Sequence, residues 1–395
     1  MKNWTFFLLF FFALWACDSR RVLIPPKLVW KSNPFKNLQI ETIYPVFFDD
    51  KIIVSQNSPN GSSELLALSV LDGSVAWRYS DKIDSLSAFY YNLKPYIFDS
   101  ILVLPNGTHT FAINMKTGKK LWLKKFGSFS EQFLEGYGRY VFQSCYESNQ
   151  AVFVCRFDCL SGHCDTIYRE GSPAGCRKVI RTPALIVENG ILKHLLLCKT
   201  EQEISSRLTV STITFVNAEN WQIEKIDTIS KRNVDGISFT KQPQIDSTSK
   251  KIYFVLNEHL ICYNLANLSF LWKSILPRDM LTSEINYCSN SIFFPSEDGF
   301  LYSIGKNSGD IVWKCKISGT PSRGYLVGKY FNIIGGGNGC WYIIDTGNGK
   351  IVAEISTPNL IKYEEIFWRR YFTVSSIHKL AIATDGKEYA LYSFK

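Results

Sequence analysis

A strand–turn–strand unit recurs along this chain about every 40 to 50 residues, and this period constrains the fold more than any single residue does. Its clearest copies are Ala67–Trp77, Ala112–Trp122 and Ser303–Trp313. In each copy an alternating apolar run leads to a glycine, and a tryptophan follows four residues later. Alternation with a period of two predicts a strand, and glycine supplies a turn with positive φ. A hairpin repeated at this spacing is typical of a propeller blade or a solenoid unit.

The repeat continues through weaker copies. The positions four residues after the turn, or five in the copy with Asn267, are Trp77, Trp122, Thr166, Glu224, Trp272, Trp313 and Ala353. In two of these copies we expect Asn220 and Asn267 to replace the glycine, because asparagine tolerates the left-handed conformation best after glycine. The long gap before the fourth copy predicts an insertion between Arg169 and Arg207. These copies make seven complete hairpins.

An eighth unit is divided between the two ends of the chain. Lys27–Lys31 matches the closing strand of a repeat, and Tyr389–Ser393 matches the strand that precedes it. If the two pair, the ring closes and leaves neither as an exposed edge. Residues 28–395 shared among eight blades give 46 residues per blade, which suits four strands and their turns. We therefore predict an all-β, eight-bladed propeller as a single domain, with seven blades as the alternative.

The N-terminus has the features of an export signal. Lys2 precedes an apolar run that is too short to span a bilayer, and the run ends at Cys17. Leu14–Cys17 resembles the bacterial lipobox, which implies a lipoprotein signal peptide at 1–16, acylation of Cys17 and a tether at 17–27. An ordinary signal or a membrane anchor is the alternative. Asp18 resembles an inner-membrane retention signal of some bacteria, so the sequence favours a periplasm-facing envelope protein without deciding between the two membranes.

Composition bounds the rest of the interpretation. Hydrophobic residues make up 46% of the chain and charged residues 20%, which is enough apolar material for a large core. The formal net charge is +9. That charge fits an anionic lipid surface, an acidic protein or a polyanionic glycan, or a merely solvated surface. The sequence has no dense run of basic residues interleaved with aromatic ones, the pattern that would indicate nucleic-acid binding.

The repeats resemble those of pyrroloquinoline-quinone-type (PQQ-like) propellers. The resemblance covers nearly the whole chain after the signal. It implies that the tryptophan packs between neighbouring blades, so that its role is structural. By this pattern the repeat tryptophans are Trp30, Trp77, Trp122, Trp272 and Trp313.

Two branches of that family are relevant here. Quinoprotein dehydrogenases hold a quinone and calcium, but they are much longer, and many carry an adjacent cysteine pair that this chain lacks. Lipoproteins of outer-membrane-protein assembly, the BamB type, resemble this chain in length, lipidated N-terminus and eight-bladed layout, and use no cofactor. The resemblance therefore implies a monomeric, non-catalytic scaffold that binds envelope proteins, in which we expect no cofactor. A quinoprotein-like oxidoreductase and a glycan-binding lipoprotein are the alternatives.

Two groups of residues could be taken for a metal site or a phosphate-binding loop, and each also has a structural explanation. Five of the 11 cysteines are Cys145, Cys176 and the three between them. For these five, disulfides, free core thiols and a metal site are all possible states. Cys159 and Cys164 flank a turn and could be bridged. The glycine-rich stretch 335–339 links two alternating runs, so we expect a turn instead of a phosphate loop.

One set of residues outside the repeat pattern has the composition of an interface. Trp368, Arg369 and Arg370 combine aromatic and arginine side chains, as binding hot spots do. The alternative is that these residues belong to a strand of the eighth blade and are core.

Overall fold

The computed structural model describes residues 26–33, 40–41, 43, 45–57, 63–80, 95–106, 109–125, 134–147, 151–233, 243–256, 259–276, 285–288, 290–296, 298–319, 321, 324–335, 340–355, 372–384 and 389–393. The elements of this part of the chain are β-strands, and they form eight sheets. No helix in it is long and apolar enough to cross a membrane.

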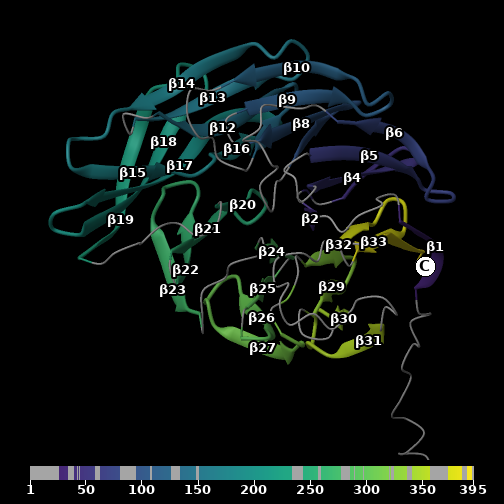
Figure 1. Cartoon of the computed structure of the whole chain (residues 1–395). Coiled ribbons are helices and arrows are strands. Elements are labelled where there is room, and N and C mark those ends of the chain that lie inside the picture. The colour runs from purple at the N-terminus through teal and green to yellow at the C-terminus, as the bar shows by residue number, and fades with distance from the viewer. Residues whose placement is uncertain are drawn as a thin grey trace, which may run out of the picture.

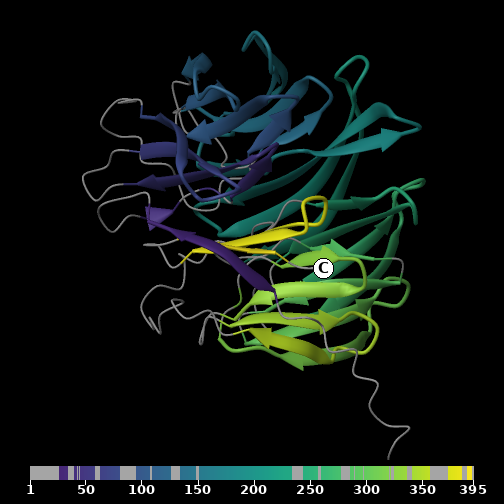
Figure 2. The ribbon, with the colours of Figure 1, turned by 90° about the vertical axis from the view of Figure 1, so that its right-hand side faces the viewer.

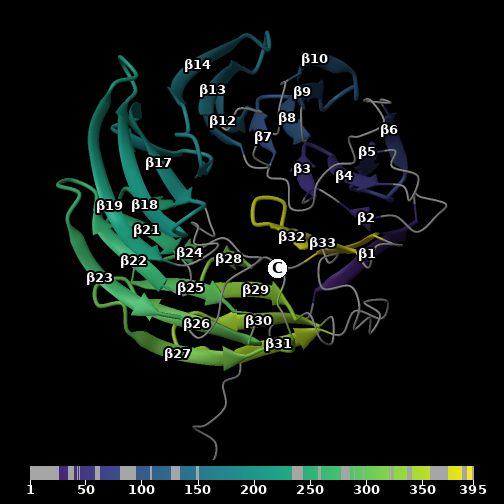
Figure 3. The same ribbon diagram turned by 60° about the vertical axis from the view of Figure 1, so that its left-hand side comes forward.

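The eight sheets stand around a common centre as the blades of a propeller (Figure 1). Within a blade the strands are antiparallel, and in the first seven blades they follow the order of the sequence from the centre outward (Figure 3). The eight-bladed prediction is confirmed, and the alternative of seven blades is wrong.

Blades 1 to 4 contain the strands up to β19. They are β2 (Ile40–Glu41), β3 (Val46–Phe48), β4 (Lys51–Asn57), β5 (Ser63–Ser69) and β6 (Val75–Tyr79); β7 (Tyr96–Phe98), β8 (Ile101–Asn106), β9 (His109–Asn114) and β10 (Lys120–Lys125); β11 (Glu135–Tyr137), β12 (Tyr140–Tyr146), β13 (Val152–Asp158) and β14 (Cys164–Glu170); and β15 (Cys176–Ile180), β16 (Ala184–Glu188), β17 (Ile191–Glu203), β18 (Leu208–Asn217) and β19 (Ile223–Asn233).

Blades 5 to 8 contain the remaining strands. They are β20 (Gln244–Asp246), β21 (Lys251–Leu256), β22 (His259–Asn264) and β23 (Phe270–Ile275); β24 (Asn286–Tyr287), β25 (Ser291–Pro295), β26 (Phe300–Gly305) and β27 (Ile311–Lys316); β28 (Tyr325–Val327), β29 (Tyr330–Ile334), β30 (Trp341–Asp345) and β31 (Ile351–Ile355); and β32 (Phe372–Ser375), β33 (Leu380–Thr384), β34 (Tyr389–Ser393) and β1 (Lys27–Ser32).

The eighth blade closes the ring with the two ends of the chain. β1 pairs antiparallel with β34, so that Trp30 lies opposite Leu391 and Lys27 opposite Ser393. Figure 2 shows the purple N-terminal strand beside the yellow C-terminal strands. The predicted division of this blade between the chain ends is confirmed.

Blade 4 contains the predicted insertion. Between Arg169 and Arg207 the chain forms β15 and the 13-residue β17, which is long enough to pair with β15 over one part and with β16 over another. The blade therefore extends further than its neighbours (Figure 3).

The apolar core is divided among the junctions between blades. Eight clusters of buried side chains are present among the described residues, and each spans two adjacent blades. The second and third strands are covered on both faces, so they read as nearly continuous apolar runs, such as Ile101–Leu104. Fourth strands such as β31 alternate between exposed and half-buried residues.

The blades present one rim of short turns. Because successive strands run in opposite directions, the turn between the first and second strands and the turn between the third and fourth strands reach the same rim. We call it the turn rim. It carries Gly118 and Gly162 on third-to-fourth turns and Arg139 on a first-to-second turn.

Candidate functional site

Some predicted site residues lie outside the described residues. They are the acylation site Cys17 and the predicted partner-contact residues Trp368, Arg369 and Arg370. The five repeat tryptophans are all described, and they define the regular geometry against which the rest of the ring can be compared.

Each repeat tryptophan lies against the turn of the next blade. A Cβ atom at Gly118 in the β9–β10 turn would stand 2.7 Å from the ring of Trp77 on β6. Trp77 Nε1 also donates a 2.8 Å hydrogen bond to the carbonyl of Met115 in that turn. The same contact joins Trp30 to Gly73, Trp122 to Gly162, Trp272 to Gly309 and Trp313 to Gly349. The turn glycine is therefore required both by its positive φ and by the indole above it.

The junction between blades 3 and 4 reverses this arrangement. Thr166 occupies the tryptophan position on β14, and Trp221 occupies the glycine position of the β18–β19 turn with φ of 61°. Trp221 N donates to Asn217 O at 2.9 Å, the bond that the turn glycine makes elsewhere. Since no indole from blade 3 covers this turn, its left-handed position can carry a large side chain.

The structure corrects the expected turn residues of blades 4 and 5. The left-handed residues are Trp221 and Leu268, whereas Asn220 and Asn267 directly precede them. Each asparagine instead accepts a hydrogen bond through its side-chain oxygen from the backbone N–H two residues further on, at 2.9 and 3.1 Å. This is the usual local bond of asparagine in turns.

The register of the fourth blade changes accordingly. Lys225, one residue beyond the predicted Glu224, lies opposite Phe215 at the tryptophan position of β19. The next turn has Leu268 where a docked tryptophan would demand glycine. The exchange at this junction therefore follows the same rule as at Trp221.

The displaced tryptophan forms a cluster with an arginine. The guanidinium carbon of Arg156 lies 4.8 Å from the ring centroid of Tyr140 and 5.3 Å from that of Trp221. Its Nη2 donates a 2.7 Å hydrogen bond to Asp165 Oδ2. Phe142 supports the indole from the core side, with centroids 6.4 Å apart. We call Tyr140, Arg156, Asp165 and Trp221 the Arg156 cluster.

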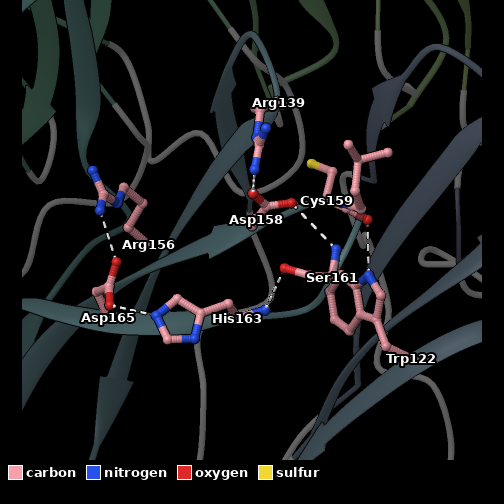
Figure 4. Close-up of polar contacts among 9 residues, drawn as sticks. Trp122, Arg139, Arg156, Asp158, Cys159, Ser161, His163 and Asp165 are labelled. Atoms are coloured by element: carbon pink, nitrogen blue, oxygen red, sulfur yellow. Dashed lines mark hydrogen bonds and ion pairs between the residues drawn. The ribbon is translucent and has the colours of Figure 1, made fainter.

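The turn of blade 3 lies next to this cluster (Figure 4). Arg139 Nε donates to Asp158 Oδ2 at 2.8 Å, and Asp158 Oδ1 accepts the backbone N–H of Leu160 at 2.9 Å. These bonds fix a turn whose tip, Leu160, is 55% exposed. His163 Nε2 lies 3.0 Å from Asp165 Oδ1, so the turn and the Arg156 cluster share one carboxylate.

The charges of this region are paired. The hydrogen bond from Arg156 lowers the pKa of Asp165. Burial alone would raise the pKa of Asp158, but the bonds from Arg139 and from backbone N–H groups outweigh it and lower this pKa as well. The arginines are thus held in fixed positions with their planar faces on aromatic rings.

The cysteines do not form the bridge that the sequence allowed. All ten described cysteines carry free thiols, Cys159 and Cys164 included. Cys155 hydrogen-bonds to the thiols of Cys145 and Cys164 on one face of blade 3. The bond with Cys145 and burial raise the pKa of Cys155 to about 12, although the bond with Cys164 acts in the opposite direction. The described part of the chain contains no group of histidine, cysteine and acidic side chains that could hold a metal. The strands on either side of the glycine-rich stretch, β29 and β30, are paired, whereas residues 336–339, where a turn is predicted, lie outside the described residues.

Sequence reasoning missed the Arg156 cluster. The expectation that Asn220 holds the turn position leaves Trp221 without a role, and Arg156 and Tyr140 lie in strands whose sequence does not distinguish them. The available signal was a tryptophan that stands at the wrong place in the repeat.

The comparisons with known proteins bear on the fold. No protein-family model and no curated protein sequence matches the chain. The structure is similar to BamB from Moraxella catarrhalis, with a TM-score of 0.63, 14% identity, and coverage of 93% of this chain and 100% of that one. It is also similar to Sqt1 from Saccharomyces cerevisiae, with a TM-score of 0.65, 10% identity, and coverage of 93% of this chain and 99% of that one. A third similar structure is the computationally designed protein Ika8, with a TM-score of 0.58, 10% identity, and coverage of 93% of this chain and 100% of that one. The chain therefore shares its overall architecture with BamB.

Proposed function

We propose that this chain is a non-catalytic scaffold that binds a partner protein at the Arg156 cluster on the turn rim. The observation that carries the proposal is the exchange at the junction of blades 3 and 4. There a tryptophan that docks blades elsewhere is moved to a turn, where it is half-buried and contacts Arg156. Departures from an otherwise consistent repeat are expected at functional sites.

The composition of the site fits protein recognition. Tryptophan, tyrosine and arginine dominate the binding energy of protein interfaces, because they bury a large area at a small cost in conformational entropy. Here Arg156 and Tyr140 are already positioned before a partner arrives, and Leu160 and Arg139 extend the surface on one side. Preorganisation of this kind raises affinity by lowering the cost of ordering side chains.

We further propose that the scaffold acts at the bacterial envelope. Acylation of Cys17 after removal of residues 1–16 would anchor it to a membrane, with residues 17–27 as the tether. The repeat resemblance and the architecture shared with BamB support a role beside the machinery that assembles outer-membrane proteins. In this proposal the ring is a monomer and needs no cofactor.

A crosslinking pulldown from native membranes tests the proposal, with the partners identified by mass spectrometry. Arg156→Ala should lower the recovery of the partner at least about tenfold, since a hot-spot side chain contributes roughly 2 kcal/mol or more. Arg78→Ala is the matched control, because Arg78 also pairs with a carboxylate, Glu64, but lies on blade 1. This control should recover the partner as the unchanged chain does, and both variants should keep its melting temperature within a few degrees.

Two results would contradict the proposal. Equal recovery with Arg156→Ala and Arg78→Ala would show that the Arg156 cluster does not bind the partner. A pulldown that recovers no protein would favour the quinoprotein or glycan alternatives, which a quinone absorbance band or sugar-dependent quenching of tryptophan fluorescence would then reveal.

A further inference from the structure

The positive charge of this chain is concentrated on the outer strands of the blades. The fourth strands, β1, β6, β10, β14, β19, β23, β27 and β31, carry thirteen lysine and arginine residues and five acidic ones, a balance of +8. The whole chain has a net charge of +9. All thirteen basic residues are exposed, whereas only Glu224 and Glu354 of the acidic ones are. The outer wall of the ring is therefore its basic surface.

Among neighbouring fourth strands that contain no acidic residue, those of blades 5 and 6 expose the most large apolar side chains. β23 and β27 lie next to each other on the outside of the ring (Figure 1, Figure 3), and neither contains an acidic residue. Their exposed basic residues are Lys273, Lys314 and Lys316. Their exposed apolar residues are Phe270 (55%), Leu271 (41%), Ile275 (70%), Ile311 (49%) and Val312 (60%). We call these eight residues the β23–β27 wall.

The combination of exposed lysines with exposed apolar residues distinguishes among the anionic partners that could bind this wall. Glycans and nucleic acids are held on aromatic platforms. Of the described aromatic residues on these two strands only Phe270 is exposed, because Trp272 is 7% exposed and docks on Gly309, and Trp313 docks on Gly349. The cores of protein interfaces are depleted of lysine. Exposed aliphatic side chains interspersed with lysines are instead the composition of surfaces that lie at a membrane interface, where lysine meets the headgroups and the aliphatic groups enter the boundary of the acyl region.

We propose that the β23–β27 wall docks on the surface of an anionic phospholipid bilayer. Lys273, Lys314 and Lys316 would contact lipid phosphates, and Ile311 and Val312 would enter between the headgroups. β1 starts at Lys27, ten residues after Cys17, and an extended segment of that length reaches about 35 Å at most. An acyl group on Cys17 would therefore hold the ring close to the bilayer, and the wall would fix its orientation.

Vesicle binding of a chain that begins at Asp18 tests the proposal without any acyl group. All eight described sheets lie between residues 27 and 393, so this chain keeps every described strand. It should co-sediment with vesicles of phosphatidylcholine and phosphatidylglycerol, and high salt should release it from them. It should bind vesicles of phosphatidylcholine alone much more weakly. Replacing Lys273→Glu and Lys314→Glu together should lower the partition coefficient at least about tenfold.

Matched variants separate a defined wall from diffuse charge. Lys116→Glu with Lys379→Glu makes the same change in net charge on exposed turns of blades 2 and 8, and should leave most of the binding. Ile311→Ser with Val312→Ser should weaken binding without changing its dependence on salt. Equal losses in the wall and turn variants, or no binding to anionic vesicles, would overturn the proposal. The result is independent of partner capture, because the Arg156 cluster lies on other blades.

Discussion

Gly118 and Trp77 form one structural unit although they belong to different blades. The indole lies where a Cβ atom of residue 118 would be, and φ of Gly118 is 70°. The converse holds at Trp221 and Leu268, where the preceding blade offers threonine or lysine and the turn carries a large side chain. The choice of glycine in these turns is thus set by the neighbouring blade as well as by the turn.

Gly118→Ala should destabilise the protein by about 3 kcal/mol, since the left-handed conformation costs alanine about 1 kcal/mol and the clash with Trp77 costs about 2 more. Urea denaturation measures the effect. Gly328→Ala is the control, because Gly328 has φ of 58° but nothing lies within 4 Å of an added Cβ atom. It should cost about 1 kcal/mol. Equal losses in the two variants would show that the indole does not constrain the turn.

At the scale of the element, buried charges join blade 3 to the extension of blade 4. Glu170 at the end of β14 accepts hydrogen bonds from Lys178 on β15 at 2.7 Å and Lys199 on β17 at 2.8 Å. The lysine side chains are 4% and 9% exposed. Burial would raise the pKa of Glu170, but these bonds and one from Tyr168 outweigh it and lower the pKa to about 2. The inserted strand β15 is therefore held by paired charge as well as by its ladder with β17.

Glu170→Gln should destabilise the protein by about 1–2 kcal/mol at pH 7, because it removes the carboxylate that pairs with buried Lys199 and one of the two that pair with buried Lys178, the other being Glu201 at 3.1 Å. The folded-state pKa is depressed, so the ionised carboxylate contributes its full stability above pH 4.5, and this contribution is lost as the pH falls toward about 2. The gap between variant and unchanged protein should narrow over that range.

Urea denaturation from pH 7 to pH 3.5 measures this gap. Glu147→Gln is the matched control, since Glu147 pairs with Arg169 at 2.6 Å on the surface and should cost less than about 1 kcal/mol. A gap for Glu170→Gln that stays constant with pH would contradict the assigned role.

At the scale of the whole molecule, the ring depends on a junction made by the two chain ends. β1 and β34 supply the pairing, and Trp30, 8% exposed, docks on Gly73 of blade 1. Trp30 Nε1 donates to Val70 O at 2.7 Å. Closure therefore uses the same contact as the other junctions but without a covalent turn within the blade.

Trp30→Ala should cost about 3–5 kcal/mol, as for other buried aromatic deletions. Amide exchange should rise most in β34, because loosening β1 exposes its partner strand. Trp272→Ala is the control with matched burial, 7% exposed, and should raise exchange in blades 5 and 6 instead. The same exchange pattern in both variants would show that closure is not a separate weak point.

The architecture could be predicted well from the sequence because the same strand–turn–strand unit occurs in several copies. The period fixes the number of blades, and the halves at Lys27–Lys31 and Tyr389–Ser393 fix the closure. The candidate site could not be predicted in the same way. It arises where the repeat is interrupted. Arg156 meets Tyr140 across two strands of blade 3 and Trp221 across the junction with blade 4, and no local pattern encodes these contacts. The state of the cysteines, which the sequence left open, could not be predicted either, since bridging depends on Cβ positions across strands.

The most direct test of the central claim is photo-crosslinking from two equivalent turn tips. Leu160 and Leu71 both stand two residues before a turn glycine, and they are 55% and 83% exposed. A photoreactive residue at position 160, beside the Arg156 cluster, should crosslink to the partner protein in native membranes, and one at position 71 should not. Equal adducts from both positions, or none from 160 in a chain that still captures the partner, would contradict the proposed interface.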